Sequence, residues 1–161
     1  MGDEVRSRVG QALVLMVRRA EEAQERAARQ HGLHPTDFRA IGYLHTRGHP
    51  VSPKALNTHL GLTSGSGTAL LDRLESCGYI SRLPNPNDRR GALIALDPEA
   101  AGAPIRLYQS IQAAYEKATL QFSPQQLEAI AGYLEHVAHL SAHLSDELYG
   151  NTAEGLDVSA A

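Results

Sequence analysis

The chain has 161 residues, 42% of them hydrophobic and 20% charged, which is the composition of a folded globular protein rather than a disordered one. A single Cys excludes a disulfide framework and a Cys-rich zinc site and fits a reducing cytoplasm. The formal net charge of -3 does not by itself indicate a nucleic-acid partner. The apolar run 12–17 is too short to span a membrane, and Asp3, Glu4 and Arg8 break the segment before it, so we expect no signal peptide and no membrane partner.

The charge is unevenly distributed along the chain. Residues 1–34 carry a net charge of +1, residues 35–98 carry +2, and residues 99–161 carry -6. A partner responds to the local field rather than to the total charge. The acidity is confined to the C-terminal part, and the mildly positive middle segment remains compatible with an acidic partner.

The first segment, residues 1–34, is predicted to be one long amphipathic helix. Its apolar residues recur at steps of three and four between Val5 and Ala27, and Gly32 is a plausible cap at the end. A helix of about 27 residues is about 40 Å long. Since a small core cannot cover such a length, part of the apolar face is expected to pack on other helices or on another subunit.

Three shorter helices are predicted next from their terminal residues. Pro35 suits a first helical position, and the helix that it begins ends near Gly48. Ser52 is an N-cap before a proline, and that helix stops at Gly61. Thr63 caps the following helix, which ends at Gly78. The last two helices are joined by two residues, which is the spacing of a helix-turn-helix.

After Gly78 the hydrophobic period changes from helical to alternating. Residues 79–83 and 92–96 are predicted strands, and the turn-forming stretch 84–91 between them is predicted to be an exposed, basic hairpin tip. Asp97 and Pro98 are expected to open another helix, in which Pro104 predicts a kink or a late start near Ala103.

A capping box begins the last predicted helix. Ser123 and Gln126 have the S-x-x-Q spacing of this motif. Residues 150–161 offer little to bury and are expected to form a flexible tail. The predicted fold class is mainly α, with some β (α+β): a winged helix-turn-helix with a two-stranded wing, flanked by N- and C-terminal helices.

A winged helix-turn-helix places its second helix in the major groove of double-stranded DNA. Hydroxyl groups at the start of that helix can bond to bases and phosphates, glycines permit close backbone approach, and the helix dipole favours phosphate. The wing would bring arginines to phosphates or into the minor groove. The candidate DNA-binding residues are Ser52, Thr63, Ser64, Gly65, Ser66, Thr68, Arg73, Asp88, Arg89 and Arg90.

From about Leu33 to Leu96 the chain resembles the MarR (multiple antibiotic resistance regulator) family of transcription factors. The residues that carry the resemblance are 60–65, 71–75 and the wing 84–91, with Asp88 and Arg90 matching the family's Asp-x-Arg signature. The resemblance implies that Arg90 contacts the minor groove and that Asp88 orients the wing through a basic neighbour. We regard Arg73 as a candidate for that neighbour.

The sequence departs from the family pattern at three positions. Asn57 stands where a small Ala often packs between the two helices, Gly67 where a Val or Ile usually enters the core, and Ala69 where many relatives carry a basic residue. Two glycines within one helix, Gly65 and Gly67, lower its stability, so we predict a recognition helix that becomes fully ordered only on DNA.

The resemblance also implies a homodimer on a palindromic operator, and a small-molecule inducer in a cleft between the dimer helices and the DNA-binding lobe. The corresponding domains are a dimerisation helix (1–34), a DNA-binding domain (35–98), C-terminal dimerisation helices (99–149) and the tail. Tyr43, Phe38 and Tyr115 are equally suited to lining that cleft and to a core position. We interpret the chain as a cytoplasmic regulator. The sequence leaves both a repressor and an activator open, and of the two we favour a repressor.

Other readings remain open at this level. Cys77 at the end of the recognition helix could act as a thiol switch, although a small side chain that only ends the helix is favoured. His136, His139 and His143 share one helix face that could hold zinc, although a solvated or dimer-facing histidine stripe is favoured over a metal site. A winged helix can also serve as a protein-interaction module that binds no DNA. No nucleophile-elbow or phosphate-loop context supports an enzyme, so no catalytic residue and no cofactor is expected.

Overall fold

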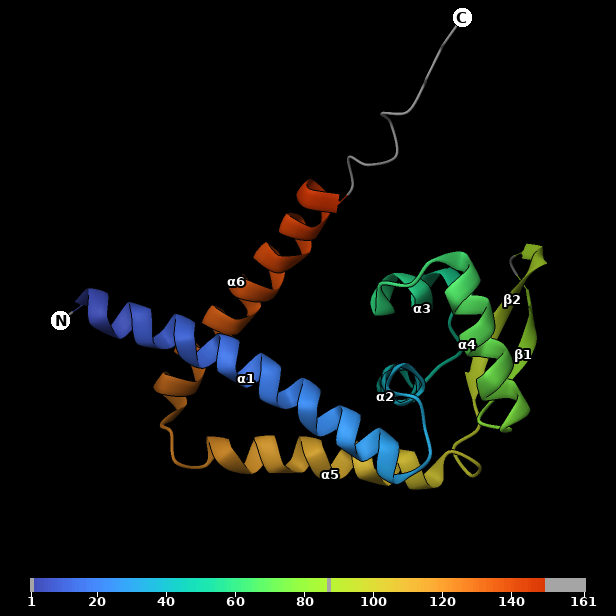
Figure 1. Cartoon of the computed structure of the whole chain (residues 1–161), viewed down its shortest axis with the longest axis horizontal. Coiled ribbons are helices and arrows are strands. Elements are labelled where there is room, and N and C mark those ends of the chain that lie inside the picture. Colours follow the sequence, from blue (N-terminus) through green and yellow to red (C-terminus); the bar gives the residue numbers. More distant parts are fainter. Residues whose placement is uncertain (1, 87, 150–161) are drawn as a thin grey trace, which may run out of the picture. The chain divides into compact units, whose positions relative to one another are not determined.

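The computed structural model describes residues 2–86 and 88–149, which contain six α-helices and one two-stranded antiparallel sheet (Figure 1). The elements in chain order are α1 (Gly2–Gln30), α2 (Pro35–Arg47), α3 (Pro53–Leu60), α4 (Ser64–Ser76), β1 (Ile80–Asn85), β2 (Asp88–Leu96), α5 (Gly102–Thr119) and α6 (Pro124–Tyr149). This order confirms the predicted fold class. The expected tail, 150–161, lies outside the described residues. Within the described part of the chain, no helix combines the length and the hydropathy needed to cross a membrane.

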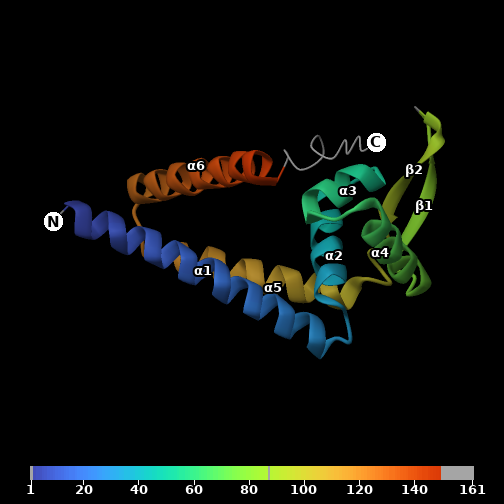
Figure 2. The same cartoon turned by 45° about the horizontal axis from the view of Figure 1, so that its top comes forward.

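Two compact units make up the chain, residues 1–112 and residues 113–161. The first unit contains α1 to α4, the hairpin and most of α5. Within it, α2 lies at the centre, with α3 and α4 on one side and with α1 and α5 on the other (Figures 1 and 2). The second unit contains the end of α5 and α6.

Side-chain caps begin α3, α4 and α6, as predicted. The Oγ of Ser52 accepts a hydrogen bond from the backbone N–H of Ala55 at 3.2 Å, and the Oγ1 of Thr63 accepts one from Ser66 at 3.3 Å. Before α6, the Gln126 side chain accepts from the Ser123 N–H at 2.8 Å, and the Ser123 hydroxyl accepts from the Gln126 N–H at 3.3 Å. Each bond satisfies an N–H group that the helix itself leaves unpaired.

Glycines in the left-handed conformation end the first four helices. Gly32, Gly48, Gly61 and Gly78 have φ angles between 66° and 74°, which a residue with a Cβ adopts only with strain. Three of these ends share one motif, in which the residue after the glycine donates at 2.9 Å to the carbonyl five positions back: Leu33 to Ala28, Leu62 to Asn57, and Tyr79 to Leu74. The predicted stops at Gly32, Gly48, Gly61 and Gly78 are confirmed.

The hairpin is longer than predicted, because its strands continue into the turn-rich stretch. Pro84 pairs with Ala92 and Asn85 pairs with Asp88, so the expected loop 84–91 is mostly strand, with a register shift between Pro84 and Asn85. Proline is tolerated in this position because a two-stranded hairpin has an outer edge that needs no hydrogen-bond donor. Val51 adds a bridge that was not predicted, with two hydrogen bonds to Ile94 at 2.7 and 3.0 Å.

The start of α5 follows the later of the two predicted alternatives. Asp97 does not open the helix directly: its carboxylate accepts from the N–H groups of Glu99 and Ala100 at 2.9 and 3.0 Å, which closes a separate turn. The helix then begins at Gly102, so Pro104 falls in the first turn, where its missing N–H interrupts no helical hydrogen bond.

Two apolar clusters hold the first unit together. The larger one joins α2, α3, α4, the hairpin and the start of α5, and its buried members include Ile41, Leu56, Leu70, Leu74 and Ile94. The smaller one packs Ala27 and Ala28 of α1 against Phe38 of α2.

Glycine permits a close approach between α2 and α5. A Cβ on Gly42 would lie 2.6 Å from the ring of Tyr108, so the ring rests directly on the backbone of α2. The Tyr108 hydroxyl also hydrogen-bonds to Thr46 at 3.2 Å, which reinforces the contact.

Candidate nucleic-acid interface

The first turn of α4 presents a polar, uncrowded surface. Ser64, Gly65, Ser66 and Thr68 are exposed, as is the cap Thr63. The hydroxyls of Thr63 and Ser66 lie 2.8 Å apart, and that of Thr68 donates to the carbonyl of Ser64 at 3.0 Å. The turn therefore combines backbone N–H groups, hydroxyl acceptors and the positive end of a helix dipole, which together favour an anion such as phosphate.

The start of α3 adds a second cluster beside α2. The Ser52 hydroxyl caps α3, and the exposed side chain of Lys54 follows it by two residues. Both line a cavity of about 480 Å³ with Arg47, whose guanidinium lies 5.1 Å from the centre of the Tyr43 ring. Sequence reasoning identified Ser52 but missed Arg47 and Lys54, because a single basic residue in a helix carries no local signal of what surrounds it.

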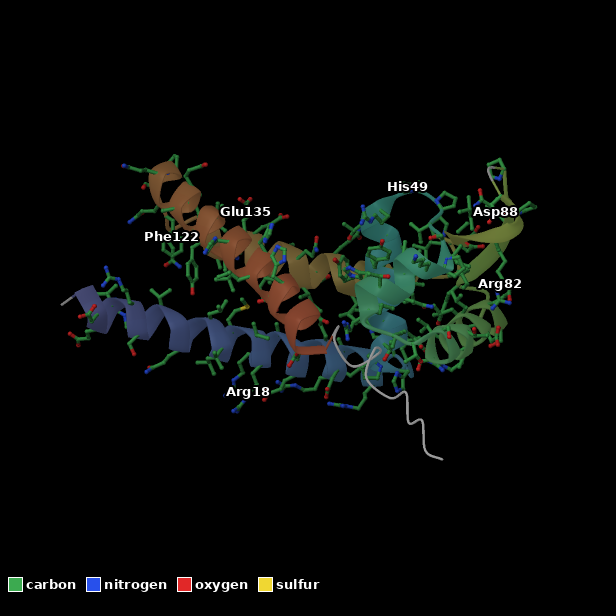
Figure 3. The ribbon with its side chains drawn as sticks, turned by 90° about the horizontal axis from the view of Figure 1, so that it is seen from above. Arg18, His49, Arg82, Asp88, Phe122 and Glu135 are labelled. Carbon is green, nitrogen blue, oxygen red and sulfur yellow. The ribbon has the colours of Figure 1, made fainter. Side chains whose placement is uncertain are left out.

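The hairpin brings the basic wing residues to the same unit. Arg89 and Arg90 belong to β2, and their side chains lie outside the described part of the structure. Asp88 is on the hairpin, while Arg82 lies nearer to α4 (Figure 3). The Asp88 carboxylate is 3.0 Å from where a Cβ on Gly91 would be, so only a glycine fits there without displacing it.

The arginine at position 73 has a different partner from the one expected. Its guanidinium donates two hydrogen bonds to Asp37 of α2, at 2.7 and 3.3 Å, and not to Asp88. The Asp37 side chain is 9% exposed and that of Arg73 is 46% exposed. The hydrogen bonds to Asp37 raise the pKa of Arg73. The predicted orienting role of Arg73 toward Asp88 is therefore wrong: Arg73 joins α4 to α2.

A second ion-pair cluster ties the hairpin to α4. Arg82 of β1 binds Asp72 and Glu75, both on α4, at 2.5 and 3.4 Å. Together with the Arg73 pair, this neutralises two of the seven basic residues that give the segment 35–98 its positive charge. The rest of the positive charge is carried by Arg39, Arg47, Lys54, Arg89 and Arg90.

A smaller cavity lies between α1, α2, α3 and α5 in the first unit. Its volume is about 230 Å³, and Arg39, Tyr43, His59 and Tyr108 are among its lining residues. The Tyr43 and His59 rings stack with centres 4.0 Å apart. Burial, together with the charges of Arg39 and Arg47, lowers the pKa of His59. The imidazole is accordingly neutral at pH 7.

The two candidate sensor sites predicted from the sequence are Cys77 and the histidines of α6. Cys77 is exposed at the end of α4. On α6 the rings of His139 and His143 lie 4.4 Å apart. Among the described residues, no group of three or more His, Cys, Asp or Glu side chains is arranged to hold a metal ion.

Comparison with known proteins finds similarity to transcription regulators. Residues 31–91 match the model of the MarR family. The chain is 46% identical over 68 residues to the HTH-type transcriptional regulator YcgE of Bacillus subtilis, an alignment that covers 42% of this chain and 44% of YcgE. The chain therefore spans less than half the length of this curated relative.

Two solved structures share the fold over most of the chain. A MarR family transcription regulator superposes with a TM-score of 0.68 at 21% identity, covering 90% of this chain and 95% of its own. A mutant MarR from E. coli complexed with operator DNA superposes with a TM-score of 0.58 at 23% identity, covering 80% and 92%. At these identities the superpositions show the fold.

The Asp37–Arg73 pair is testable by a double-mutant cycle. Asp37→Ala should lower the free energy of unfolding by about 1–2 kcal/mol, because it removes two hydrogen bonds to a half-exposed guanidinium. Arg73→Ala should cost more, because it leaves the buried Asp37 carboxylate without its partner, and the double variant should be little less stable than Asp37→Ala. Urea unfolding followed by circular dichroism measures all four proteins. Strictly additive losses would show that the two side chains do not interact.

Proposed function

We propose that this chain, which belongs to the MarR family through residues 31–91, is a DNA-binding transcriptional repressor that acts as a homodimer in the cytoplasm. One arrangement carries the proposal: the exposed first turn of α4 and the hairpin that bears Arg89 and Arg90 belong to one unit, in which α4 is fixed to α2 and to β1 by ion pairs. A helix held in this way can be presented to a groove without losing its orientation.

In the proposed complex, α4 enters the major groove with its first turn at the base edges. Ser64, Ser66 and Thr68 would bond to bases or phosphates, and Gly65 would allow the backbone to approach closely. Arg90 would enter the minor groove, where the negative potential favours a guanidinium group. Arg73 would support this surface from behind and would not contact DNA, because its guanidinium is bound to Asp37.

Exposed apolar surface on α1 supports a homodimer. Val14 is 70% exposed, Leu15 53% and Met16 48%, all within the run of six consecutive apolar residues 12–17. Six consecutive helical residues extend around the whole helix, and apolar surface of this extent is a mark of an interface. In the second unit, Leu134 and Leu140 of α6 are also exposed, by 41% and 47%.

A two-fold dimer would present two copies of α4 to one face of the duplex, about 34 Å apart, which is one helical turn of DNA. The operator is then a palindrome whose half-sites are separated by that turn. The E. coli MarR complexed with operator DNA has the same fold, which supports this mode of binding.

The cavity lined by Arg39, Tyr43, His59 and Tyr108 is our candidate for the inducer site. Arginine and aromatic rings together suit a small anionic aromatic compound. Since the cavity is lined by both α3 and α5, a bound molecule can shift the helix-turn-helix relative to the helices behind it.

The wing assignment is tested by Arg90→Ala. Affinity for a duplex selected from random-sequence DNA by the wild-type protein should fall at least about fivefold, which corresponds to about 1 kcal/mol, the usual scale of such a contact. Fluorescence anisotropy at fixed salt measures this loss. Arg106→Ala, at an exposed arginine of α5, is the matched control and should bind like the wild type. Equal affinities of the Arg90 and Arg106 variants would contradict the wing assignment.

The dimer is tested by Val14→Arg. A charge on this exposed apolar surface should weaken dimerisation by at least about tenfold, without unfolding the lobe, because an unpaired charge is costly to bury between subunits. Sedimentation equilibrium measures the dimer, and circular dichroism checks the fold. Gln30→Arg adds the same charge to the exposed end of α1 and should leave the dimer intact. If Val14→Arg leaves the dimer unchanged, α1 is not the interface.

The inducer site is tested by pH and by substitution. A panel of aromatic carboxylic acids is screened for release of the selected duplex, and the most effective acid is titrated between pH 7.5 and 5. Its binding should strengthen as pH falls through the lowered pKa of His59, because protonation adds a positive charge beside the anion. His59→Gln should flatten this dependence, and Arg39→Ala should weaken binding at every pH. A response unaffected by both changes would place the inducer elsewhere.

A further inference from the structure

Two of the three positions at which the helix-turn-helix departs from the family pattern, Asn57 and Gly67, are in direct contact. A Cβ built on Gly67 of α4 would overlap the side-chain amide of Asn57 of α3, meeting its oxygen, nitrogen and carbon atoms. Gly67 is buried, so the Asn57 amide fills the space that a side chain at position 67 would take. Gly65 in the same turn is exposed, and a Cβ there would meet no atom within 4 Å.

Asn57 also closes the turn between the two helices. Its backbone carbonyl accepts from the N–H of Leu62 at 2.9 Å, across the glycine that ends α3. Gly67 in turn donates its N–H to the carbonyl of Thr63, the residue that caps α4, at 2.9 Å. Asn57 therefore contacts both the turn, through Leu62, and α4, at Gly67.

We propose that Asn57 is a positioning residue for α4: its amide rests on Gly67 and sets how closely the DNA-reading helix approaches α3. The role in DNA binding rests on the function proposed above. The two departures are then one adaptation, in which bulk that usually projects from α4 is supplied by α3.

The chemistry of the contact shows that it is not optimised for stability. The Asn57 side-chain oxygen is buried and, among the described residues, has no hydrogen-bond partner. Such an atom disfavours the folded state relative to an apolar group of the same shape. A Cβ added at position 67 must displace the amide, either by rotation of the Asn57 side chain about its Cα–Cβ bond or by an increase in the spacing of α3 and α4.

The contact itself is tested by melting temperatures, which do not depend on DNA binding. Gly67→Ala should lower the melting temperature by at least about 5 °C, on the scale of an overpacked core. In an Asn57→Ala background the same substitution should lower it by less than about 2 °C, or raise it, because the blocking amide is gone. Gly65→Ala is the matched control in the same helix and should raise the melting temperature in both backgrounds.

Equal losses in the two backgrounds would overturn the contact. If Gly67→Ala alone does not fold, recovery of folding by Asn57→Ala supports the contact, and failure to recover overturns it.

The positioning role is tested by sequence discrimination, measured well below the melting temperatures. The readout is the ratio of affinities for the selected duplex and for a scrambled duplex of equal length. Gly67→Ala should reduce this ratio at least about tenfold, because base contacts require an exact helix position whereas phosphate contacts tolerate a shift. The double variant should recover to within about threefold of the wild type.

Each outcome of the second test is decisive. Coupled melting temperatures with an unchanged affinity ratio would reduce the pair to a packing contact and overturn the positioning role. A wild-type protein that selects no duplex would contradict the proposed function, and it would remove the positioning role with it. The melting temperatures would still decide the contact between Asn57 and Gly67.

Discussion

The ion pair between Asp37 and Arg73 is the interaction on which the geometry of the proposed reading surface depends most directly, since it joins the central helix α2 to α4. An aliphatic contact between two helices permits sliding and rotation, whereas two hydrogen bonds to one carboxylate fix a direction. The buried Asp37 makes this constraint strong, because a carboxylate shielded from water is costly without a partner. The clustered apolar residues hold α2 and α4 together, and the ion pair selects one arrangement of them.

These ion pairs reduce the positive charge that the segment 35–98 can offer to a partner. Arg73 and Arg82 count toward the net charge of the segment, yet both are engaged by carboxylates within the lobe. The basic residues left for an external partner belong to α2, α3 and the hairpin and not to α4. In the proposed function, attraction to a polyanion and recognition of its sequence would then fall to different elements, which is how nucleic-acid binders commonly divide the two tasks.

Local sequence was sufficient for the parts of the fold that depend on neighbouring residues. The helices after Ser52, Thr63 and Ser123 begin where a capping side chain accepts a hydrogen bond from the N–H three residues later, and the first four helices end at single glycines. Both signals are local, so the sequence alone predicts them. The length of the hairpin was underestimated because Pro84 signals a turn locally, while its pairing with Ala92 is a property of the assembled sheet.

The candidate site divides along the same line. The composition of the first turn of α4 is local, and it was identified in full. The partner of Arg73 lies 36 residues away, and no periodicity connects the two positions. In the sequence, Asn57 and Gly67 are two separate departures from the family pattern. That the Asn57 side chain fills the space left by the missing side chain of Gly67 becomes clear only when the packing of α3 on α4 is known.

The left-handed glycines at the ends of the first four helices have a genetic consequence. Gly32, Gly48, Gly61 and Gly78 fall within 47 residues, and at each of them any other residue would strain the backbone. At none of the four would an added Cβ meet another atom within 4 Å, so substitution there would weaken the fold by conformation alone and leave the surface and the core unchanged. Alleles at these codons are therefore expected to be conditional, functional in the cold and lost on warming, which would make them useful tools for switching the protein off in living cells.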